Sequence, residues 1–573
     1  MPKLLQASSI LLRFALALLI ATSGAAGVTG PAQAQAQSDL VDKLFQRWDR
    51  PDRPGMTVAI LKDGQPVYVR GYGMANVELA VPNGPDVAYP LASNSKQFTA
   101  FAIHLLVADG KLSLADDVRK YVPELPDFGT PISLEMLIHH TSGLREATSL
   151  LDLQGYGPED AVSRQQALDL LWRQQELNFR PGSEYIYNNS NYLLLGLIVE
   201  RVSGMPLGEF WQRRIFQPLG MTRTHASADP MPIIPHRASG YGGNGDRYTP
   251  RQTPDVLLGP SGITSTVGDL AKWLANFDNP NTVGNPAVIA AMLKTGTLSD
   301  GTPITYASGL HREHYRGLPF IEHSGHNWGY KTEILRFPNR HLTIIILANT
   351  DAADPPSLAF RIADIYLGGQ FPPSPPKPAT IATPVDLIDR YVGTYAVATG
   401  TTLRAPGRRY VFRREDFIGP GAQLAAFTPT DFFSPQSDFR AHFVPAPQGG
   451  QSQRVVIRND DGDDFVARRV PDAVPPPPPE TFDSSAFTGD YWSPELGVLY
   501  RVRQRHGKLW LRYPRGEAEL RPQSRDVFSW RQDGNSIHFV RDADHVGGFL
   551  LTQPNQRVRN LRFAKVTMAS ETP

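Results

Sequence analysis

The sequence predicts an α+β protein in which an antiparallel sheet flanked by helices is followed by two all-β, barrel-like modules. Strand-like stretches stand near both ends of residues 37–370 with helical stretches between them, proline-rich breaks follow, and the rest of the chain repeats itself. The 573 residues are too many for one core, since a domain usually has about 100 to 200 residues. We therefore expect three or more domains.

Residues 1–36 have the pattern of a secretory signal peptide. Lys3 and Arg13 precede the apolar run LALLIATSGAAGV, which is too short to span a bilayer comfortably, and PAQAQAQ follows with small residues two apart. Cleavage is expected after Ala34 or Ala36, and an uncleaved anchor is the alternative. The mature protein is therefore expected to be periplasmic or secreted, and free of the membrane.

The composition argues against several partners. Lys and Arg total 57 and Asp and Glu 56, so the net charge of +1 gives no electrostatic reason to expect nucleic acid or an anionic membrane. The chain has no cysteine, which excludes a disulfide framework and a lipid-attachment cysteine. Stability must come from ordinary cores.

Residues 37–370 predict a sheet built from both ends of the segment. MTVAIL and PVYVRGYG flank a turn signal at 62–64 and predict a hairpin, and helices are predicted over 97–108 and 191–202. FIEHSG, KTEILRF and LTIIILANT then predict three late strands. Two early and three late strands enclosing helices predict an antiparallel sheet.

The remaining chain is predicted to hold two homologous modules, 385–473 and 481–573, separated by proline-rich linkers at 371–384 and 474–480. YVGTY at 391–395 matches FTGDY at 487–491, and HFV at 442–444 matches HFV at 538–540, both at an offset of 96 residues. Leu424 and Leu520 keep the same offset, so three anchors agree on one register. Alternating runs such as VLYRVRQRHGKLWLRY mark the modules as all-β.

Ser93 and Lys96 form a Ser-x-x-Lys pattern that means little alone, because chance also supplies Ser374-x-x-Lys377 in the first linker. Ser93, however, is followed by apolar residues at helical spacing as far as the stop signal Asp109-Gly110. Ser93 and Lys96 are then one turn apart at the positive end of a helix, which disfavours an ammonium. This combination suits a serine nucleophile without a histidine base, and a helix cap beside an exposed lysine is the alternative.

Two further motifs follow in order, and together the three resemble the family of serine β-lactamases, penicillin-binding proteins and related esterases and D-aminopeptidases. Tyr187-Asn188-Asn189 fits the Tyr-x-Asn motif of the branch that includes class C β-lactamases. For the third motif, Lys294-Thr295-Gly296 follows a helix-like stretch, whereas His323-Ser324-Gly325 ends a predicted strand. His-x-Gly replaces Lys-Thr-Gly in several relatives, so His323 is the preferred candidate.

The resemblance implies a β-lactamase-like fold with an all-helical subdomain, followed by two lipocalin-like modules as in the D-aminopeptidase architecture. It implies catalytic roles for Ser93, Lys96, Tyr187 and His323, with either Lys96 or Tyr187 as the base, and no metal or other cofactor. The implied substrate-binding residues are Asn189, Ser324, Gly325 and His326. The backbone N–H groups of Ser93 and His326 would form the oxyanion hole. HHTSGL at 139–144 and SGITSTVGDLAKW at 261–273 also resemble the family and are interpreted as structural loops.

The implied function is hydrolysis, through an acyl-enzyme, of D-amino-acid peptides or amides or of small esters. Replacement of lysine by His323 removes the cation that usually pairs with a substrate carboxylate, which weakens the β-lactamase and DD-peptidase readings. A penicillin-binding or β-lactam-sensing protein is the alternative. In D-aminopeptidases a loop of the last barrel restricts the active site, and the matching hairpin here, 513–520, looks shorter and lacks an aspartate.

Two other interpretations fit the sequence less well. His311, His314, His323 and His326 have a spacing that zinc could accept, but no acidic partner is evident in the sequence. No serine has the Gly-x-Ser-x-Gly context of an α/β-hydrolase, and no phosphate loop or dinucleotide fingerprint appears. The β modules are also a candidate homodimer interface.

Overall fold

The computed structural model describes residues 31–226, 229, 232–243, 247–251, 257–372, 376–397, 408–419, 422–446, 448–459, 464–470, 483–530, 534–543 and 545–567. Residues 1–30 of the predicted signal peptide and the proline run at 474–480 lie outside these ranges. The predicted cleavage positions Ala34 and Ala36 lie in helix α2, Pro31–Phe45. Within the described ranges, no helix is long and apolar enough to cross a membrane.

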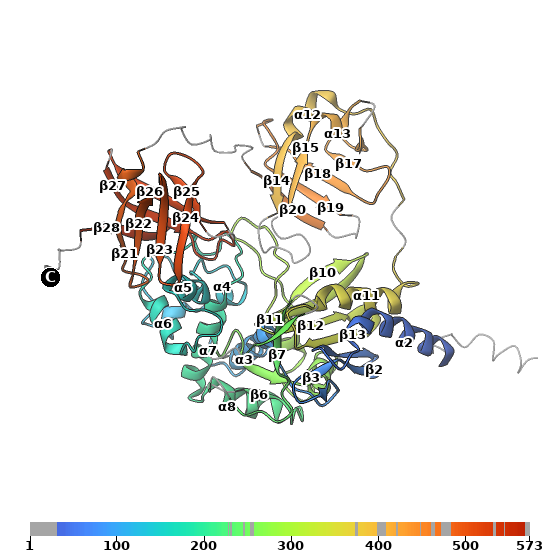
Figure 1. The fold of residues 1–573 in the computed structure, drawn as a ribbon. Coiled ribbons are helices and arrows are strands. Elements are labelled where there is room, and N and C mark those ends of the chain that lie inside the picture. Colours follow the sequence, from blue (N-terminus) through green and yellow to red (C-terminus); the bar gives the residue numbers. More distant parts are fainter. Residues whose placement is uncertain are drawn as a thin grey trace, which may run out of the picture.

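A six-stranded antiparallel sheet forms the centre of the first domain, in the order β10-β11-β12-β13-β1-β2 (Figure 1). The predicted hairpin is β1 (Met56–Lys62) and β2 (Gln65–Tyr72), and the three predicted late strands are β11 (Leu318–Asn327), β12 (Tyr330–Phe337) and β13 (Leu342–Ala348). The prediction omitted the edge strand β10, His311–Tyr315, whose HREHY sequence is short and mostly polar. β13 pairs with β1, which joins the two chain ends in one sheet.

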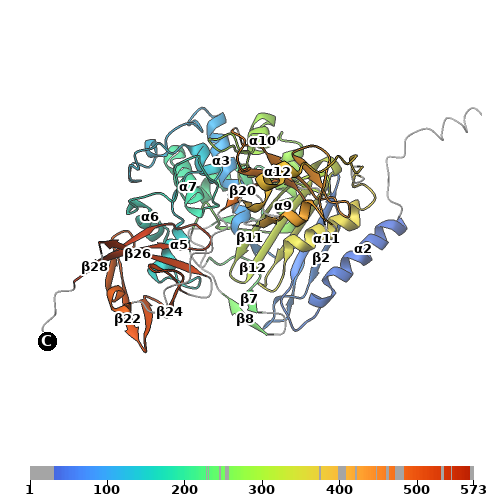
Figure 2. The ribbon, with the colours of Figure 1, turned by 90° about the horizontal axis from the view of Figure 1, so that it is seen from above.

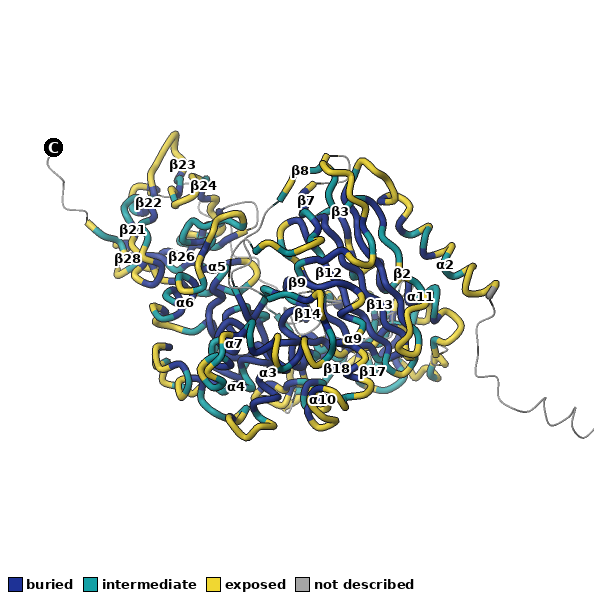
Figure 3. The backbone as a smooth tube through the Cα atoms, turned by 90° about the horizontal axis from the view of Figure 1, so that it is seen from below, coloured by how far each residue is buried: buried dark blue, intermediate teal, exposed yellow. Residues whose placement is uncertain are grey.

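The central strands are buried on both faces because a layer of helices covers each. Ile344 and Ile346 of β13 belong to the core formed with α2 and α11 (Pro355–Leu367), and Ile345 and Leu347 belong to the core formed with the other helices. This alternation follows from the two-residue period of a strand. Figure 2 shows α2 and α11 side by side along the sheet, and Figure 3 shows the buried strands between the layers.

The second layer contains the all-helical subdomain that positions the candidate site. Its central helices are α3 (Lys96–Ala108) and α7 (Asn189–Ser203), close to the predicted spans. The other helices of this layer are α4 (Leu134–Ile138), α5 (Ala147–Gln154), α6 (Arg164–Trp172), α8 (Leu207–Trp211), α9 (Val267–Asp278) and α10 (Pro286–Met292), with a π-helical turn at Gln212–Phe216.

Short elements connect these parts of the first domain. The 3₁₀ turns are η1 (Gln46–Trp48), η2 (Ala92–Ser95), η3 (Val118–Lys120) and η5 (Pro338–Arg340). The short strands are β3 (Met74–Asn76), β4 (Val81–Pro82), β5 (Tyr89–Pro90), β6 (His225–Ala226), β7 (Gly240–Gly243), β8 (Tyr248–Arg251) and β9 (Ile263–Ser265). β5 and β6 both pair with β9, so the chain entering η2 is tied to the segment after residue 260.

The first β module is a seven-stranded antiparallel sheet, ordered β15-β14-β20-β19-β18-β17-β16, which does not close into a barrel within the described residues. Its helices are α12 (Val385–Tyr391) and α13 (Arg414–Phe417). Its strands are β14 (Gly393–Val397), β15 (Arg409–Phe412), β16 (Ala425–Ala426), β17 (Asp431–Phe433), β18 (Arg440–Val444), β19 (Arg454–Arg458) and β20 (Asp464–Val470).

The second module is a closed eight-stranded barrel, β21 to β28, entered through η6 (Ser484–Phe487). Its strands are β21 (Gly489–Ser493), β22 (Val498–Arg505), β23 (Lys508–Tyr513), β24 (Gly516–Pro522), β25 (Val527–Trp530), β26 (Asn535–Asp542), β27 (His545–Thr552) and β28 (Leu561–Val566). The sequence repeat has a matching contact in each module. The Tyr395 hydroxyl donates to the Tyr391 carbonyl at 3.0 Å, and the Tyr491 hydroxyl donates to the Phe487 carbonyl at 2.7 Å.

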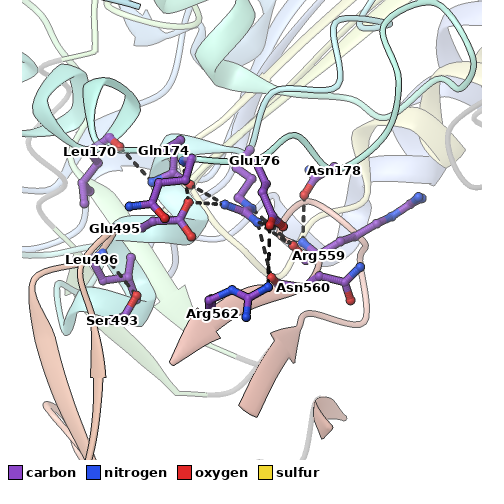
Figure 4. Close-up of polar contacts among 12 residues, drawn as sticks. Leu170, Gln174, Glu176, Asn178, Ser493, Glu495, Leu496, Arg559, Asn560 and Arg562 are labelled. Atoms are coloured by element: carbon purple, nitrogen blue, oxygen red, sulfur yellow. Dashed lines mark hydrogen bonds and ion pairs between the residues drawn. The ribbon is translucent and has the colours of Figure 1, made fainter. Parts of the chain in front are cut away.

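The barrel docks on the helical subdomain through polar contacts, of which some are buried (Figure 4). Arg145, wholly buried after α4, pairs with Glu495 in the β21–β22 turn. The Arg559 guanidinium, between β27 and β28, donates to both carboxylate oxygens of Glu184 at 3.0 and 2.9 Å. The Tyr500 hydroxyl donates to the Leu153 carbonyl at 2.8 Å. These contacts bring loops of the barrel close to Tyr187 of the candidate site.

Candidate active site

Ser93 lies in the 3₁₀ turn η2, immediately before α3 begins at Lys96. The sequence placed Ser93 at the start of the helix, and the structure places it one turn earlier. Ala92 has a φ of +49°, a strained conformation for a residue with a Cβ. A Cβ at Gly325 would lie 2.3 Å from the Leu91 carbonyl oxygen, so the glycine of the third motif lets η2 pack directly on β11.

Lys96 is fully buried and its amine contacts the nucleophile. Lys96 Nζ lies 3.0 Å from Ser93 Oγ, 2.8 Å from Asn189 Oδ1 and 3.1 Å from the Pro260 carbonyl oxygen. The last two atoms can only accept a hydrogen bond. Two of the N–H groups of Lys96 are therefore directed at Asn189 and Pro260, and the third direction from Nζ faces Ser93.

Tyr187 also contacts Ser93. Burial raises the pKa of Tyr187, while a hydrogen bond with Ser93 and the charge of Arg557 act in the opposite direction. Lys96 Nζ lies 4.8 Å from the centre of the Tyr187 ring, and the Arg557 guanidinium lies 5.3 Å from it. Because its pKa is raised, Tyr187 is a neutral phenol near neutral pH and can donate a proton.

His323 is buried on β11 and is neutral at physiological pH. Burial lowers the pKa of His323 to about 3, and the charge of Lys96, when its amine is protonated, acts in the same direction. Its Nδ1 lies 2.6 Å from the Ser324 carbonyl oxygen and its Nε2 lies 3.2 Å from the Tyr306 hydroxyl. Since a carbonyl only accepts, Nδ1 carries the proton and Nε2 accepts from Tyr306. His323 therefore provides no positive charge.

A cavity of about 360 Å³ opens onto the nucleophile. Ser93, Asn189 and His326 line it together with residues of α5, the loop after it and the segment before β9. Ser324 and Gly325 are not in its lining. Gly325 instead packs against Leu91 and Ala92, where the chain enters η2. The complete lining is Ala92, Ser93, Thr148, Leu151, Asp152, Tyr156, Gly157, Pro158, Asp160, Val162, Asn189, Leu257, Pro260, Ser261, His326, Asn327 and Trp328.

The hairpin at 513–520 reaches this cavity despite its shortness. A Cβ at Gly155 would lie 2.6 Å from the Pro514 side chain, and a Cβ at Gly157 would lie 2.1 Å from a guanidinium nitrogen of Arg515. The hairpin of the second barrel therefore packs against the loop that forms one wall of the cavity. In place of an aspartate, it brings Arg515 there.

Sequence reasoning missed four groups at the site. Tyr306, which is fully buried, holds His323, and the His140 ring lies 4.6 Å from that of Tyr187. Pro260 contributes its carbonyl to Lys96, and Arg557 reaches Tyr187 from the barrel. His140 and Pro260 lie in or beside segments that were interpreted as structural loops, so that interpretation was incomplete. Tyr306 and Arg557 carry no motif, and only the fold brings them to the site.

Two competing candidates lie elsewhere. The side chain of Lys294, from the other possible third motif, is largely exposed and pairs with Glu135 at 3.6 Å. His311 and His323 are buried with ring centres 5.9 Å apart, whereas His314 is exposed on β10. In the parts of the chain that the structure describes, no group of three or more His, Asp or Glu residues has the arrangement of a metal site.

Known proteins resemble this chain over its first domain. The family model described as Beta-lactamase matches residues 40–367. The chain is 29% identical over 297 residues to a D-aminopeptidase of Gluconobacter oxydans, covering 52% of this chain and 56% of that protein. It is 30% identical over 323 residues to a D-aminopeptidase of Brucella anthropi, covering 55% and 59%. The matches thus span less than two thirds of these curated relatives.

A solved structure resembles most of the fold. The octameric penicillin-binding protein homologue from Pyrococcus abyssi aligns with a TM-score of 0.52 at 22% identity, covering 84% of this chain and 99% of that one. At this identity the likeness concerns the fold alone.

Proposed function

Since the chain belongs to the β-lactamase family of serine hydrolases, we propose that it hydrolyses amides or peptides of D-amino acids through an acyl-enzyme on Ser93. The observation that carries the proposal is the position of Ser93 Oγ, which contacts Lys96 Nζ and the Tyr187 hydroxyl and faces the cavity. The substrate class follows the D-aminopeptidases to which the chain is similar.

Lys96 acts as the base in this proposal. A neutral amine has two N–H groups and one lone pair. With its two N–H groups on Asn189 Oδ1 and Pro260 O, the lone pair of Lys96 faces Ser93 Oγ and can take its proton without breaking another hydrogen bond. Ser93 attacks the carbonyl carbon, and the N–H groups of Ser93 and His326 receive the oxyanion.

Tyr187 acts as the acid. Its raised pKa keeps the phenol protonated, so it can give its proton to the leaving amine as the C–N bond breaks. Lys96, now an ammonium, then returns a proton to Tyr187, and water cleaves the ester on Ser93. His323 keeps Tyr306 in place beside Tyr187, their ring centres 6.2 Å apart, and contributes no charge to substrate binding.

The charges around the cavity favour a substrate without a carboxylate at the reacting end. His323 is neutral and Lys294 pairs with Glu135 at the surface, so neither supplies the cation that a β-lactam or a C-terminal D-Ala carboxylate needs. The cavity wall instead carries the carboxylates of Asp152 and Asp160. Arg515 beside Gly157 offsets part of this negative charge. The negative charge that remains favours a substrate with an ammonium group or with no charge.

A substrate panel tests the proposal. The purified chain is assayed with D-alanine amide, L-alanine amide, a peptide ending in D-Ala, nitrocefin and p-nitrophenyl acetate. We expect steady-state turnover of D-alanine amide in preference to its L-enantiomer, and a loss of about 10³-fold or more in Ser93→Ala. A stoichiometric burst without turnover would indicate a β-lactam-sensing protein instead. Wild-type turnover in Ser93→Ala would exclude this mechanism.

Export of the protein is a further part of the proposal. It is supported by the signal-peptide pattern of residues 1–36. N-terminal sequencing of the protein from a periplasmic fraction is expected to begin at residue 35 or 37.

A further inference from the structure

We infer that Arg557, in the loop joining β27 to β28 of the second barrel, is a positioning residue of the active site that strengthens Tyr187 as a proton donor. The guanidinium lies 5.3 Å from the centre of the Tyr187 ring. A cation at this position stabilises the phenolate that remains after the proton has left. The inference rests on the function proposed above and adds a residue from a different domain.

The loop is held at the site by its backbone rather than by the Arg557 side chain. The Arg557 carbonyl accepts a hydrogen bond from the Glu146 N–H at 3.1 Å and from Asn178 Nδ2 at 2.8 Å. Asn178 Oδ1 accepts from the Arg559 N–H at 2.8 Å, and Figure 4 shows Asn178 and Arg559 facing each other across the interface. Val558 is fully buried. The loop therefore has its own anchors.

The Arg557 guanidinium lies over the Tyr187 ring, and its charge also acts on the buried carboxylate of Glu146. Among the described residues it lies within ion-pair or hydrogen-bond distance of no side chain, and its ring contact is with Tyr187. By contrast, Arg559 pairs with Glu184 and Arg145 pairs with Glu495. An arginine that served only to dock the barrel would be expected to pair with one of the carboxylates nearby.

The charges around Tyr187 explain why such a cation is needed. Glu146, fully buried at the start of α5, is held as a carboxylate by Thr148 and Ser149. Its negative charge opposes formation of a phenolate on Tyr187, and the positive charge of Arg557, from the barrel, acts in the opposite direction. The titratable and charged groups around Tyr187 are Lys96 of α3, His140 after α4, Glu146 before α5, Tyr185 two residues before Tyr187, Tyr192 of α7, Tyr306 before β10, His323 of β11, and Arg557. Glu322 of β11 also acts on Tyr187, from the opposite face of the sheet.

Lys96 shares this role for only part of the cycle. Its amine is engaged with Ser93, Asn189 and Pro260, and in the proposed mechanism it is charged only between its uptake of the Ser93 proton and its return of a proton to Tyr187. Arg557 is charged throughout the cycle. The second barrel would thus contribute to the chemistry through one side chain, as well as covering the cavity wall.

The test compares two leaving groups on one acyl group, D-alanine amide and the p-nitrophenyl ester of D-alanine. The amide needs a proton from Tyr187 to depart, and nitrophenolate does not. We expect Arg557→Met to lower kcat for the amide about tenfold or more and to leave kcat for the ester and both KM values within about twofold. Arg557→Lys should restore most of the amide rate, because it restores the charge.

Arg559→Gln is the matched control, since it removes a cation and a docking ion pair from the same loop but not the charge over Tyr187. We expect its ratio of amide to ester rates to equal that of the wild type. The ratio does not depend on the folded fraction, so partial unfolding of a variant leaves the test intact. An unchanged ratio in Arg557→Met, or an equal change in Arg559→Gln, would overturn the inference about Arg557 but not the proposed function. No Ser93-dependent turnover in the wild type would overturn the proposed function and the inference with it.

Discussion

Glu322 and Glu333 are two buried carboxyl groups on β11 and β12 that the proposed chemistry does not use. Glu322 neighbours His323 on a strand, so its side chain points to the opposite face of the sheet, and Glu333 faces the same way in the register of the two strands. Burial, and then the proximity of Glu333 and Glu313, raises the pKa of Glu322, and burial raises the pKa of Glu333 to about 8. The folded state therefore holds protons here that the unfolded chain releases above pH 4.5.

This pair gives a pH dependence of stability with a definite sign. The contribution is fully present below the unfolded pKa of about 4.5 and is lost as pH rises through the folded pKa of about 8. We expect Glu333→Gln, which cannot ionise, to gain free energy of unfolding relative to the wild type between pH 5 and pH 8.5 in urea denaturation. Glu209→Gln, on the surface helix α8, should show no such trend. A difference that stayed constant with pH would contradict this account.

The motif residues Ser93, Lys96 and Tyr187 could be predicted from the sequence because each stands at a local signal, a helix start or the loop before one. Tyr306 and Arg557 could not, since each meets the site only through tertiary packing and has no neighbour in the chain that marks it. For Ser324, the motif predicted a substrate contact that the cavity lining does not include, although the lining does include His326.

At the scale of elements, the two strand groups, helices α3 and α7, and the repeated modules were predicted closely, because each has a strong period or an internal copy. The edge strand β10 was not, since only every second residue of HREHY is buried and those include His311 and Glu313. The docking of the barrel on the helical subdomain was also unpredicted. It rests on polar pairs and on apolar contact between α5 and the barrel, and neither leaves a pattern in a sequence.

The pair of Arg145 and Glu495 is the interface contact with the largest expected effect. Both side chains are buried, and Arg145 also donates to Gln174 Oε1 at 3.1 Å and to the Arg559 carbonyl. Glu495→Gln removes the buried counter-ion of the guanidinium and leaves only the half-exposed Glu176, at 3.9 Å, so we expect the free energy of unfolding to fall by about 3 kcal/mol. Thermal or urea unfolding of the full chain measures it.

Glu517→Gln provides the comparison within the same barrel. Glu517 pairs with Arg505 at 2.7 Å, but the pair lies at the surface, with 51% and 32% of the Arg505 and Glu517 side chains exposed, so the loss should be far smaller. If the two substitutions had equal effects, the barrel would not be held through the buried pair.

For the whole molecule, the sequence predicted which domains are present but not that one of them completes the site. The hairpin at 514–515 and the loop at 553–560 come from the second barrel and reach the cavity wall and Tyr187, more than 300 residues away in the chain. Such contacts depend on how folded domains dock, which no local pattern records. The first β module contacts the first domain through Arg468 and Asp300, at 2.6 Å, away from these loops.

The central claim is that Ser93 is the nucleophile of a serine hydrolase, and covalent labelling tests it most directly. The full-length chain, Ser93→Ala and Ser374→Ala are treated with a fluorophosphonate, and intact mass and peptide mapping locate the adduct. We predict one phosphonyl group on the peptide containing Ser93 in the wild type and none in Ser93→Ala. Ser374→Ala, which removes the serine of the other Ser-x-x-Lys pattern, should be labelled like the wild type. Labelling of Ser93→Ala at the wild-type level, or an adduct on another residue, would contradict the account.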